Sequence, residues 1–270
     1  MSNYYQDNLN ANGLYQVYQT ELPRIRQYLQ AEIDYVKKAL TGNEHILEIG
    51  AGYGRIMKEL SPAAAAVTGI DISDNSVQLG KEYLKGCTNC RLLTMDAHSL
   101  TFDGEFDVVI CLQNGLSAVK GNPGELIRGC LNALKPGGTA YFSTYSDKIW
   151  ETRLDWFREQ ARKGLLGEVD EEKTKDGVII CKDGFRADTF SRQDFISLGE
   201  ASGCRYEVDA GGTAGGHNGR TITCTLCAQV TATNINSSPM HTRWHVPDCC
   251  FYCKSVRTSS PSFNVLSYFL

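Results

Sequence analysis

Residues 46–54 read ILEIGAGYG, an apolar run with one carboxylate that leads into glycine at every second position. An ordered glycine gives up more chain entropy than any other residue, so three glycines so close together require a structural reason. A backbone without Cβ atoms lets a ligand lie against the chain, and the N-terminus of a helix offers unpaired amides. The stretch therefore predicts a strand that turns into a helix around a ligand-binding loop.

Short apolar runs alternate with stretches of helical spacing on both sides of this loop. Several runs are too apolar to have a face in water, which is typical of parallel strands covered on both sides. We expect strands at 45–49, 66–70, 91–95, 106–112, 139–144, 205–208 and 221–228, and helices at 23–40, 53–60, 74–84, 123–134 and 191–203. The pattern predicts an α/β fold with a doubly wound, seven-stranded, mainly parallel sheet and helices on both faces. Such sheets bind ligands at the carboxyl ends of their strands.

Two carboxylates end the second and third expected strands. Asp71 follows Gly50 at the distance where a carboxylate accepts both hydroxyls of a ribose. Asp96 is followed by the small Ala97, although an aspartate here is also suited to cap the next turn. The third glycine is Gly54, one place earlier than the dinucleotide fingerprint requires. Two acids suit a nucleoside with a free ribose, and they favour a cationic cofactor over an anionic one.

With these residues the chain resembles the class I S-adenosylmethionine-dependent methyltransferases of the small-molecule, type 11-like sort. LEIGAGYG is similar to the family's first motif, GIDIS to its second strand and MDAHSL to its adenine-side acid. FDVVICLQNG is similar to its fourth strand, and LKPGGTAYFS to its fifth strand with the preceding turn. The resemblance covers 44–144 motif by motif and 191–228 by pattern. It implies a Rossmann-like fold, S-adenosyl-L-methionine as the cofactor and methyl transfer to a small molecule.

The resemblance also implies which residues bind the cofactor. Asp71 would hold the ribose, and Asp96 with Ala97 would border the adenine. Glu48 would either fix the glycine loop or reach the amino group of the methionine part through water. Backbone at Leu112 would lie near the sulfonium. The full implied set is Glu48, Gly50, Ala51, Gly52, Gly54, Asp71, Ile72, Asp96, Ala97 and Leu112.

Methyl transfer from a sulfonium needs little acid–base chemistry from a protein, because the leaving group is already good. Positioning and the exclusion of water supply most of what an in-line displacement requires. A general base matters only for an acceptor that arrives protonated. The sequence shows no acid–base pair or nucleophile triad, and the candidate catalytic residues are Tyr5, Asn114 and His217. The alternative function is an inactive nucleoside-binding or scaffold protein of the same fold.

The chain divides into a core and added segments. Residues 1–42 are expected to form an N-terminal helical cover, and 43–228 the cofactor-binding domain, with an insert at 145–190 as a substrate lid. Aromatic residues in the cover and the insert favour a lid that shields a sulfonium. Residues 229–270 are rich in Ser, Thr and Asn and depart from the family pattern. A poorly ordered tail, an added lid and a contact for a partner remain open for this extension.

Composition narrows the class of protein. A chain of 270 residues with 42% hydrophobic and 21% charged residues is typical of a globular protein. The net charge of −4 disfavours a nucleic-acid surface, which is usually basic. Neither a membrane span nor an export signal is evident, so we expect a cytoplasmic protein with reduced cysteines.

Several cysteines have spacings that also occur in zinc sites. Cys224 and Cys227 are expected on a strand, where residues three apart point to opposite faces. The tail carries a set spaced by four residues, interrupted by Pro247: His241, His245, Cys249 and Cys253. We therefore expect no metal. The motifs determine neither the methylated atom (nitrogen, oxygen or carboxylate) nor the oligomeric state.

Overall fold

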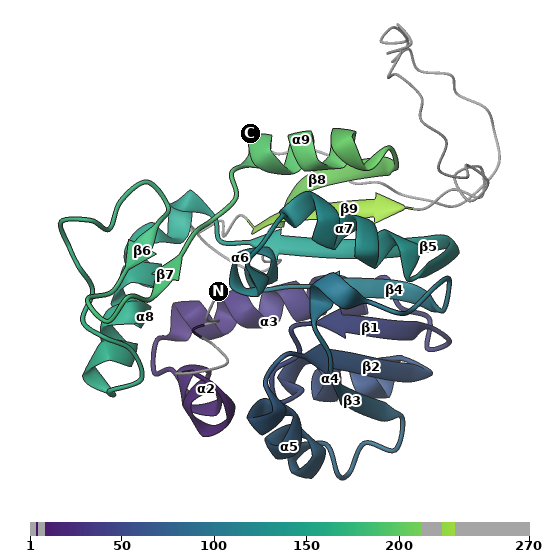
Figure 1. Cartoon of the computed structure of the whole chain (residues 1–270), viewed down its shortest axis with the longest axis horizontal. Coiled ribbons are helices and arrows are strands. Elements are labelled where there is room, and N and C mark those ends of the chain that lie inside the picture. Colours follow the sequence, from purple (N-terminus) through teal and green to yellow (C-terminus); the bar gives the residue numbers. More distant parts are fainter. Residues whose placement is uncertain (1–3, 5–8, 212–222, 230–270) are drawn as a thin grey trace, which may run out of the picture. The chain divides into compact units, whose positions relative to one another are not determined.

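The computed structural model describes residues 4, 9–211 and 223–229, with backbone only at 209–211 and 223–229 (Figure 1). The predictions for Tyr5, for His217 and for the extension beyond Gln229 lie outside the described residues.

A mainly parallel sheet forms the centre of the fold, with strand order β3-β2-β1-β4-β5-β9-β8 (Figure 1). The parallel strands are β1 (His45–Ile49), β2 (Ala66–Asp71), β3 (Cys90–Thr94), β4 (Phe106–Cys111) and β5 (Leu134–Thr144). The antiparallel strands are β9 (Thr223–Gln229), beside β5, and β8 (Arg205–Gly211), beside β9. The expected mainly parallel α/β sheet is therefore confirmed.

Helices cover both faces of the sheet. Consecutive strand residues point to opposite faces, so Ile46 and Leu47 enter different apolar clusters. One cluster packs against α3 (Pro23–Lys37), α4 (Arg55–Leu60) and α5 (Asp74–Tyr83). The other packs against α7 (Pro123–Asn132) and α9 (Arg192–Ser202). Burial on both faces explains why the strands read as nearly continuous apolar runs.

The ends of α9 agree with the sequence prediction. The hydroxyl of Ser191 accepts a hydrogen bond from the N–H of Asp194, and the Asp194 carboxylate accepts from the N–H of Ser191, which is a capping box. Gly203 ends the helix with a φ of +69°, a conformation that glycine adopts without the Cβ clash of other residues.

The start of β5 differs from the prediction. We expected a strand only from Thr139, after a turn at 136–138, but β5 begins at Leu134. Leu134 pairs with Phe106 and Thr139 with Val108, so the residues between them bulge opposite Asp107. Lys135 in this bulge pairs with the Asp107 carboxylate at 2.8 Å. The bulge lets the proline and glycines lie inside a strand without breaking its ends.

A third apolar cluster lies outside the sheet, and we call it the cap. It combines α2 (Ala11–Val17), the first half of α3, α8 (Trp150–Arg162) and the hairpin of β6 (Ile179–Ile180) and β7 (Arg186–Ala187). Two short helices complete the described fold near the cap: α6 (Gly115–Val119) and the 3₁₀ turn Asp147–Ile149. The cap thus joins the N-terminal segment to the insert that follows β5.

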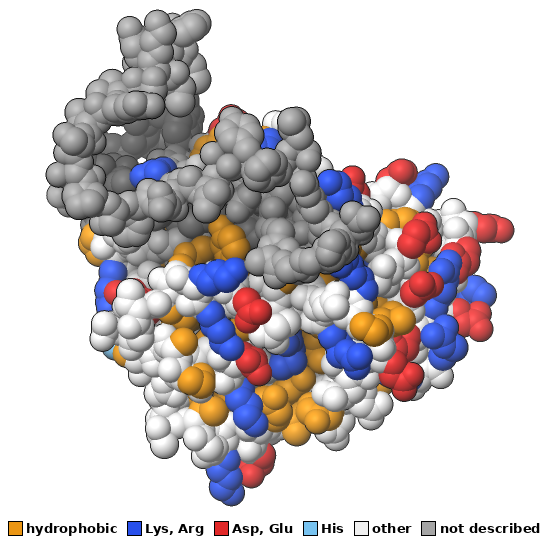
Figure 2. All heavy atoms as spheres, turned by 180° about the vertical axis from the view of Figure 1, so that it is seen from behind, with side chains coloured by type: hydrophobic (Ala, Val, Ile, Leu, Met, Phe, Trp, Pro, Cys, Tyr) orange, Lys and Arg blue, Asp and Glu red, His pale blue; other side chains and the backbone are white. Residues whose placement is uncertain are grey.

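The described surface carries both signs of charge. On the face that Figure 2 shows, acidic and basic side chains are interspersed, with apolar side chains between them. Among the described residues on that face, no extended basic stripe of the kind that follows a phosphate backbone is visible. No helix in the described part of the chain is long and apolar enough to cross a membrane.

Candidate functional site

A cavity of about 1140 Å³, including its open mouth, lies between the carboxyl ends of the parallel strands and the cap. Open α/β sheets bind small molecules at this place, outside the carboxyl ends of their strands. The strand half is lined by Gly50, Ile70, Asp71, Ile72, Met95, Asp96, Ala97 and Leu112. The cap half is lined by Tyr145, Trp156, Phe157, Gln160, Phe185 and Ala187. The structure thus gathers most of the sequence-predicted residues at one edge of the sheet.

The glycine loop has the backbone conformation that its sequence requires. Gly52 and Gly54 have φ values of +55° and +83°, where residues with a Cβ are strained. A Cβ on Gly52 would also fall 2.6 Å from a methyl carbon of Leu14, and one on Gly54 would fall 2.6 Å from Leu84. Gly50 lines the cavity, whereas Gly54 lies outside it at the N-terminus of α4. The third glycine therefore serves the close packing of the loop.

Asp71 fastens the glycine loop to the end of β2. Its Oδ2 accepts a hydrogen bond from the N–H of Gly52 at 2.8 Å, and its Oδ1 accepts from the N–H of Ser73 at 2.9 Å. Burial raises the pKa of Asp71, and these two N–H groups partly offset that effect. Each carboxylate oxygen keeps a further lone pair for a ligand in the cavity. The contact with Gly52 was not predicted from the sequence.

Asp96 caps the turn that follows β3, as the alternative interpretation held. Its Oδ1 accepts a hydrogen bond from the N–H of His98 at 2.9 Å, at the start of the 3₁₀ turn Ala97–Ser99. Asp96 is exposed and also lines the cavity beside the buried Ala97. Capping occupies one site on this carboxylate and leaves its other oxygen available to a ligand.

A side chamber of about 370 Å³ adjoins the glycine loop and shares Gly50 and Leu112 with the main cavity. Its lining includes Glu48, whose side chain is 4% exposed and whose Oε2 has no hydrogen-bond partner. Burial raises the pKa of Glu48 to about 8, although nearby Arg55 lowers it. One oxygen of this carboxyl is therefore left for a ligand, while a hydrogen bond from the backbone N–H of Met57 in α4 also lowers its pKa.

Arg55 is the main residue of this chamber that the sequence prediction missed. Its guanidinium lies 4.3 Å from the ring centre of Tyr18 and donates to Oε1 of Gln113 at 2.5 Å. Its Nε is buried without a hydrogen-bond partner. A buried carboxyl oxygen and a buried guanidinium N–H, both unsatisfied, thus line one small chamber. The sequence signal was an arginine directly after the third glycine.

The end of β4 has an unusual backbone at the centre of the site. Gln113 and Asn114 have φ values of +55° and +66°, which are rare for residues other than glycine. Nδ2 of Asn114 donates to the carbonyl of Asp188 at 2.7 Å, and its Oδ1 accepts from the Thr144 hydroxyl at 2.8 Å. Both ends of the Asn114 amide are therefore used in the protein, which favours positioning over direct chemistry for this candidate.

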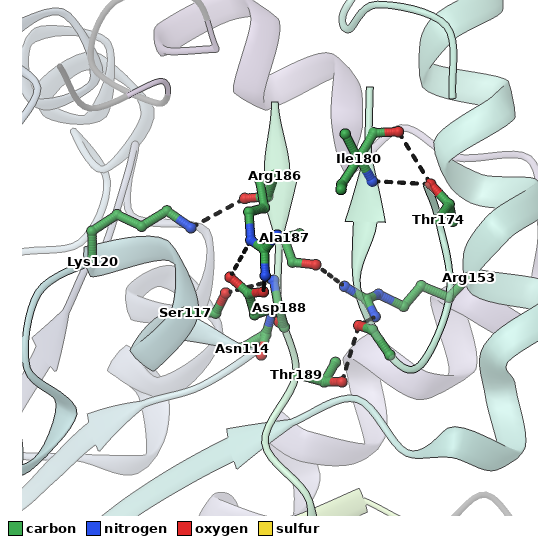
Figure 3. A network of polar contacts seen from close by, with 11 residues as sticks. Asn114, Ser117, Lys120, Arg153, Thr174, Ile180, Arg186, Ala187, Asp188 and Thr189 are labelled. Atoms are coloured by element: carbon green, nitrogen blue, oxygen red, sulfur yellow. Dashed lines mark hydrogen bonds and ion pairs between the residues drawn. The ribbon is translucent and has the colours of Figure 1, made fainter. Parts of the chain in front are cut away.

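Polar contacts hold the β7 strand of the cap on two sides (Figure 3). From α6, the Ser117 hydroxyl accepts from the N–H of Asp188 at 3.1 Å, and Lys120 at the end of the helix donates to the carbonyl of Arg186 at 3.1 Å. From α8, Arg153 donates to the carbonyl of Ala187 at 3.5 Å. The cap wall beside the cavity is thus tied to the same segment that carries Asn114.

Metal coordination finds no support in this part of the molecule. In the ranges that the structure describes, no group of three or more His, Cys, Asp or Glu residues is arranged to hold an ion. The His and Cys set of the tail lies outside those ranges.

Residues 46–138 match the family model described as a methyltransferase domain. A curated relative, the ubiquinone biosynthesis O-methyltransferase of Coxiella burnetii, is 28% identical over 121 residues, which are 42% of this chain and 48% of the relative. The chain thus spans about half the length of the curated relatives that it matches.

Solved structures share the fold. A S-adenosylmethionine-dependent methyltransferase of Methanosarcina mazei aligns with a TM-score of 0.54 and 22% identity, over 73% of this chain and 97% of that one. N-methyltransferase NodS of Bradyrhizobium japonicum, solved with S-adenosyl-L-homocysteine, aligns with a TM-score of 0.54 and 14% identity, over 85% of this chain and 99% of NodS. Both likenesses show a Rossmann-like fold.

Proposed function

We propose, from the match of residues 46–138 to the family model described as a methyltransferase domain, that the chain transfers a methyl group from S-adenosyl-L-methionine to a small-molecule acceptor. The observation that carries the proposal is the side chamber beside the glycine loop. Its unsatisfied Glu48 Oε2 and Arg55 Nε complement the ammonium and carboxylate groups of an amino acid. The neighbouring acids of the strand half complement a nucleoside.

The residues of the strand half fit the parts of this cofactor in order. Asp71 would accept the ribose hydroxyls, and Asp96 with Ala97 would border the adenine. Gly50, Ala51 and Gly52 would lie against the methionine part, because they line the main cavity or the side chamber. Ile72 would pack on the nucleoside, and backbone at Leu112 would face the sulfonium.

When bound, S-adenosyl-L-methionine supplies an activated methyl group on a cationic sulfur. The protein's part is to hold the acceptor in line with that methyl group and to keep water out. The aromatic side chains of the cap half can both position the acceptor and exclude water, and their ring faces suit a neighbouring cation. In this proposal, residues 1–42 form a cover over the site, and residues 43–228 form the catalytic domain with its seven strands. Within that domain, residues 145–190 form the substrate lid.

The acceptor is a small molecule in this proposal, and oxygen is the favoured atom. The curated relatives are named as O-methyltransferases of ubiquinone biosynthesis. The proposal also includes a cytoplasmic location and excludes nucleic acid as a substrate.

Label transfer tests the proposal. The full chain is incubated with S-adenosyl-L-methionine labelled in its methyl group and a pool of small metabolites, and labelled products are separated by mass. We expect one or a few labelled products whose yield at a limiting concentration of the cofactor falls with Asp71→Asn. Tight binding of the cofactor without any labelled product would favour the inactive nucleoside-binding alternative.

A further inference from the structure

We propose that Gln160 recognises a hydroxyl or carbonyl oxygen on a planar, uncharged aromatic acceptor. The inference rests on the proposed function, and it names the class of acceptor that the cap half takes.

Gln160 is a buried residue whose amide has no hydrogen-bond partner among the described residues. Its side chain is 3% exposed and lines the cavity, and no hydrogen bond joins its amide to any described residue. The two other amide side chains at the cavity are Gln113 and Asn114, and protein groups satisfy both ends of each. Buried polar groups are normally hydrogen-bonded, so the Gln160 amide is the group of this wall that awaits a ligand.

The walls around Gln160 suit a flat ring. On α8, Gln160 follows Trp156 by four residues and Phe157 by three, so it is a neighbour of both on the helix surface. The Trp156 indole donates to the carbonyl of Val17 at 3.2 Å, which fixes the ring. Across the cavity wall, the ring centre of Phe185 lies 5.6 Å from that of Phe157. Rigid aromatic walls favour a planar aromatic guest, by offset stacking or edge contacts.

Arg153 packs against the aromatic rings of Tyr145 and Phe157. The Arg153 guanidinium lies 4.8 Å from the ring centre of Tyr145 and 5.7 Å from that of Phe157. It also donates to the carbonyl of Gly177 at 2.9 Å, on the loop before β6. Because Arg153 packs behind the rings and does not line the cavity, it shapes the wall without offering its charge to a ligand directly.

The cap half offers no formal charge to an acceptor. Among the described residues that line it there is no Asp, Glu, Lys, Arg or His; the two lining carboxylates, Asp71 and Asp96, belong to the strand half. A charged acceptor would lose its hydration there without gaining an ion pair. An amide both donates and accepts, so Gln160 fits a hydroxyl or a carbonyl oxygen on a neutral ring.

The reaction with a phenolic acceptor balances without a further reagent. The phenolic oxygen forms a bond to the methyl carbon as the carbon–sulfur bond breaks. The electron pair of that bond stays on sulfur, which leaves S-adenosyl-L-homocysteine, and the phenolic proton passes to water at the cavity mouth.

Three probes with the same catechol ring test the class of acceptor: neutral 4-methylcatechol, cationic 3,4-dihydroxybenzylamine and anionic 3,4-dihydroxybenzoate. Binding to the complex of the full chain with S-adenosyl-L-homocysteine is measured by calorimetry, and kcat/KM by methyl transfer. We expect the affinity and the kcat/KM for the neutral probe to exceed those for each charged probe by about tenfold or more. Failure of 4-methylcatechol to bind, or preference for a charged probe, would overturn the inference.

Gln160→Leu tests the residue itself, with the exposed Gln193→Leu as the matched control. We expect Gln160→Leu to raise KM for 4-methylcatechol about tenfold and to leave S-adenosyl-L-homocysteine binding unchanged. Its Tm should stay equal or rise, because no described residue loses a hydrogen bond. Unchanged KM in Gln160→Leu would overturn the role of Gln160. Absence of cofactor binding in the unaltered chain would instead contradict the proposed function.

Discussion

Oε2 of Glu32 accepts a hydrogen bond from the backbone N–H of Gln113 at 3.0 Å, which ties α3 to the left-handed end of β4. The Tyr28 hydroxyl lies 2.8 Å from both Oε1 of Glu32 and the carbonyl oxygen of Thr144. One hydroxyl hydrogen cannot serve two acceptors. If Glu32 is protonated, it donates to Tyr28, and Tyr28 donates to Thr144. Burial raises the pKa of Glu32 to about 7, which agrees with this arrangement.

The first prediction concerns stability and pH. The pKa of Glu32 is higher in the folded chain, so its contribution is complete below the unfolded value near 4.5 and is lost as pH rises towards 7. Between pH 5 and 7 the unaltered chain should lose about 2 kcal/mol of unfolding free energy relative to Glu32→Gln. Urea unfolding at several pH values measures this. The exposed Glu200→Gln serves as the control, and a pH-independent difference would refute the assignment.

The second prediction concerns proton release at Glu48. With a pKa of about 8, Glu48 is mostly protonated at pH 7 in the free chain. An ammonium group favours the carboxylate, so cofactor binding should release about one proton at pH 7, and affinity should rise from pH 6 to 8. Calorimetry in buffers of different ionisation enthalpy counts that proton. Glu48→Gln should bind more weakly and release none; proton release that persists in this variant would show that another group is responsible.

The third prediction concerns the guanidinium of Arg55, which lines the side chamber together with Glu48. Arg55→Met should weaken S-adenosyl-L-methionine binding by about 1–3 kcal/mol, because a charged hydrogen bond to the cofactor carboxylate is lost. The exposed Arg91→Met, on β3, is the matched control. Equal affinities of the two variants would remove Arg55 from the site.

The fourth prediction concerns the N-terminal cover. Val17 accepts the Trp156 indole N–H, and Tyr18 lines both the cavity and the side chamber. Deletion of residues 1–19 removes both and opens the site to water. We expect turnover to be abolished while circular dichroism still shows a folded sheet. A truncated chain that methylates at the normal rate would show that the segment is not a lid.

The sequence predicted the structural features that depend on residues close together in the chain. The glycine spacing and the acids at strand ends located the strand half, because loop conformation and strand ends are determined by neighbouring residues. Asp71 and Asp96 accordingly lie at the cavity. The apolar alternation likewise predicted a sheet covered on both faces. The proline and glycines at 136–138 misled the prediction of β5, since a bulge accommodates them within the strand.

The rest depends on packing between distant segments. Glu32 meets Gln113 across 81 positions in the sequence, and no local pattern marks that contact. Arg55 has a buried Nε without a hydrogen-bond partner, and Gln160 is a buried residue that lines the cavity, and only the folded arrangement shows either feature. From the sequence pattern alone, Gln160 looks like an ordinary polar residue of α8.

The central claim is that the strand half binds S-adenosyl-L-methionine through Asp71, and calorimetric titration of the full chain with this cofactor tests it most directly. We predict saturable one-to-one binding that Asp71→Asn weakens by about 1–3 kcal/mol, while the exposed control Asp103→Asn leaves it unchanged. Absence of binding, or equal affinity of the Asp71→Asn variant and the unaltered chain, would contradict the account.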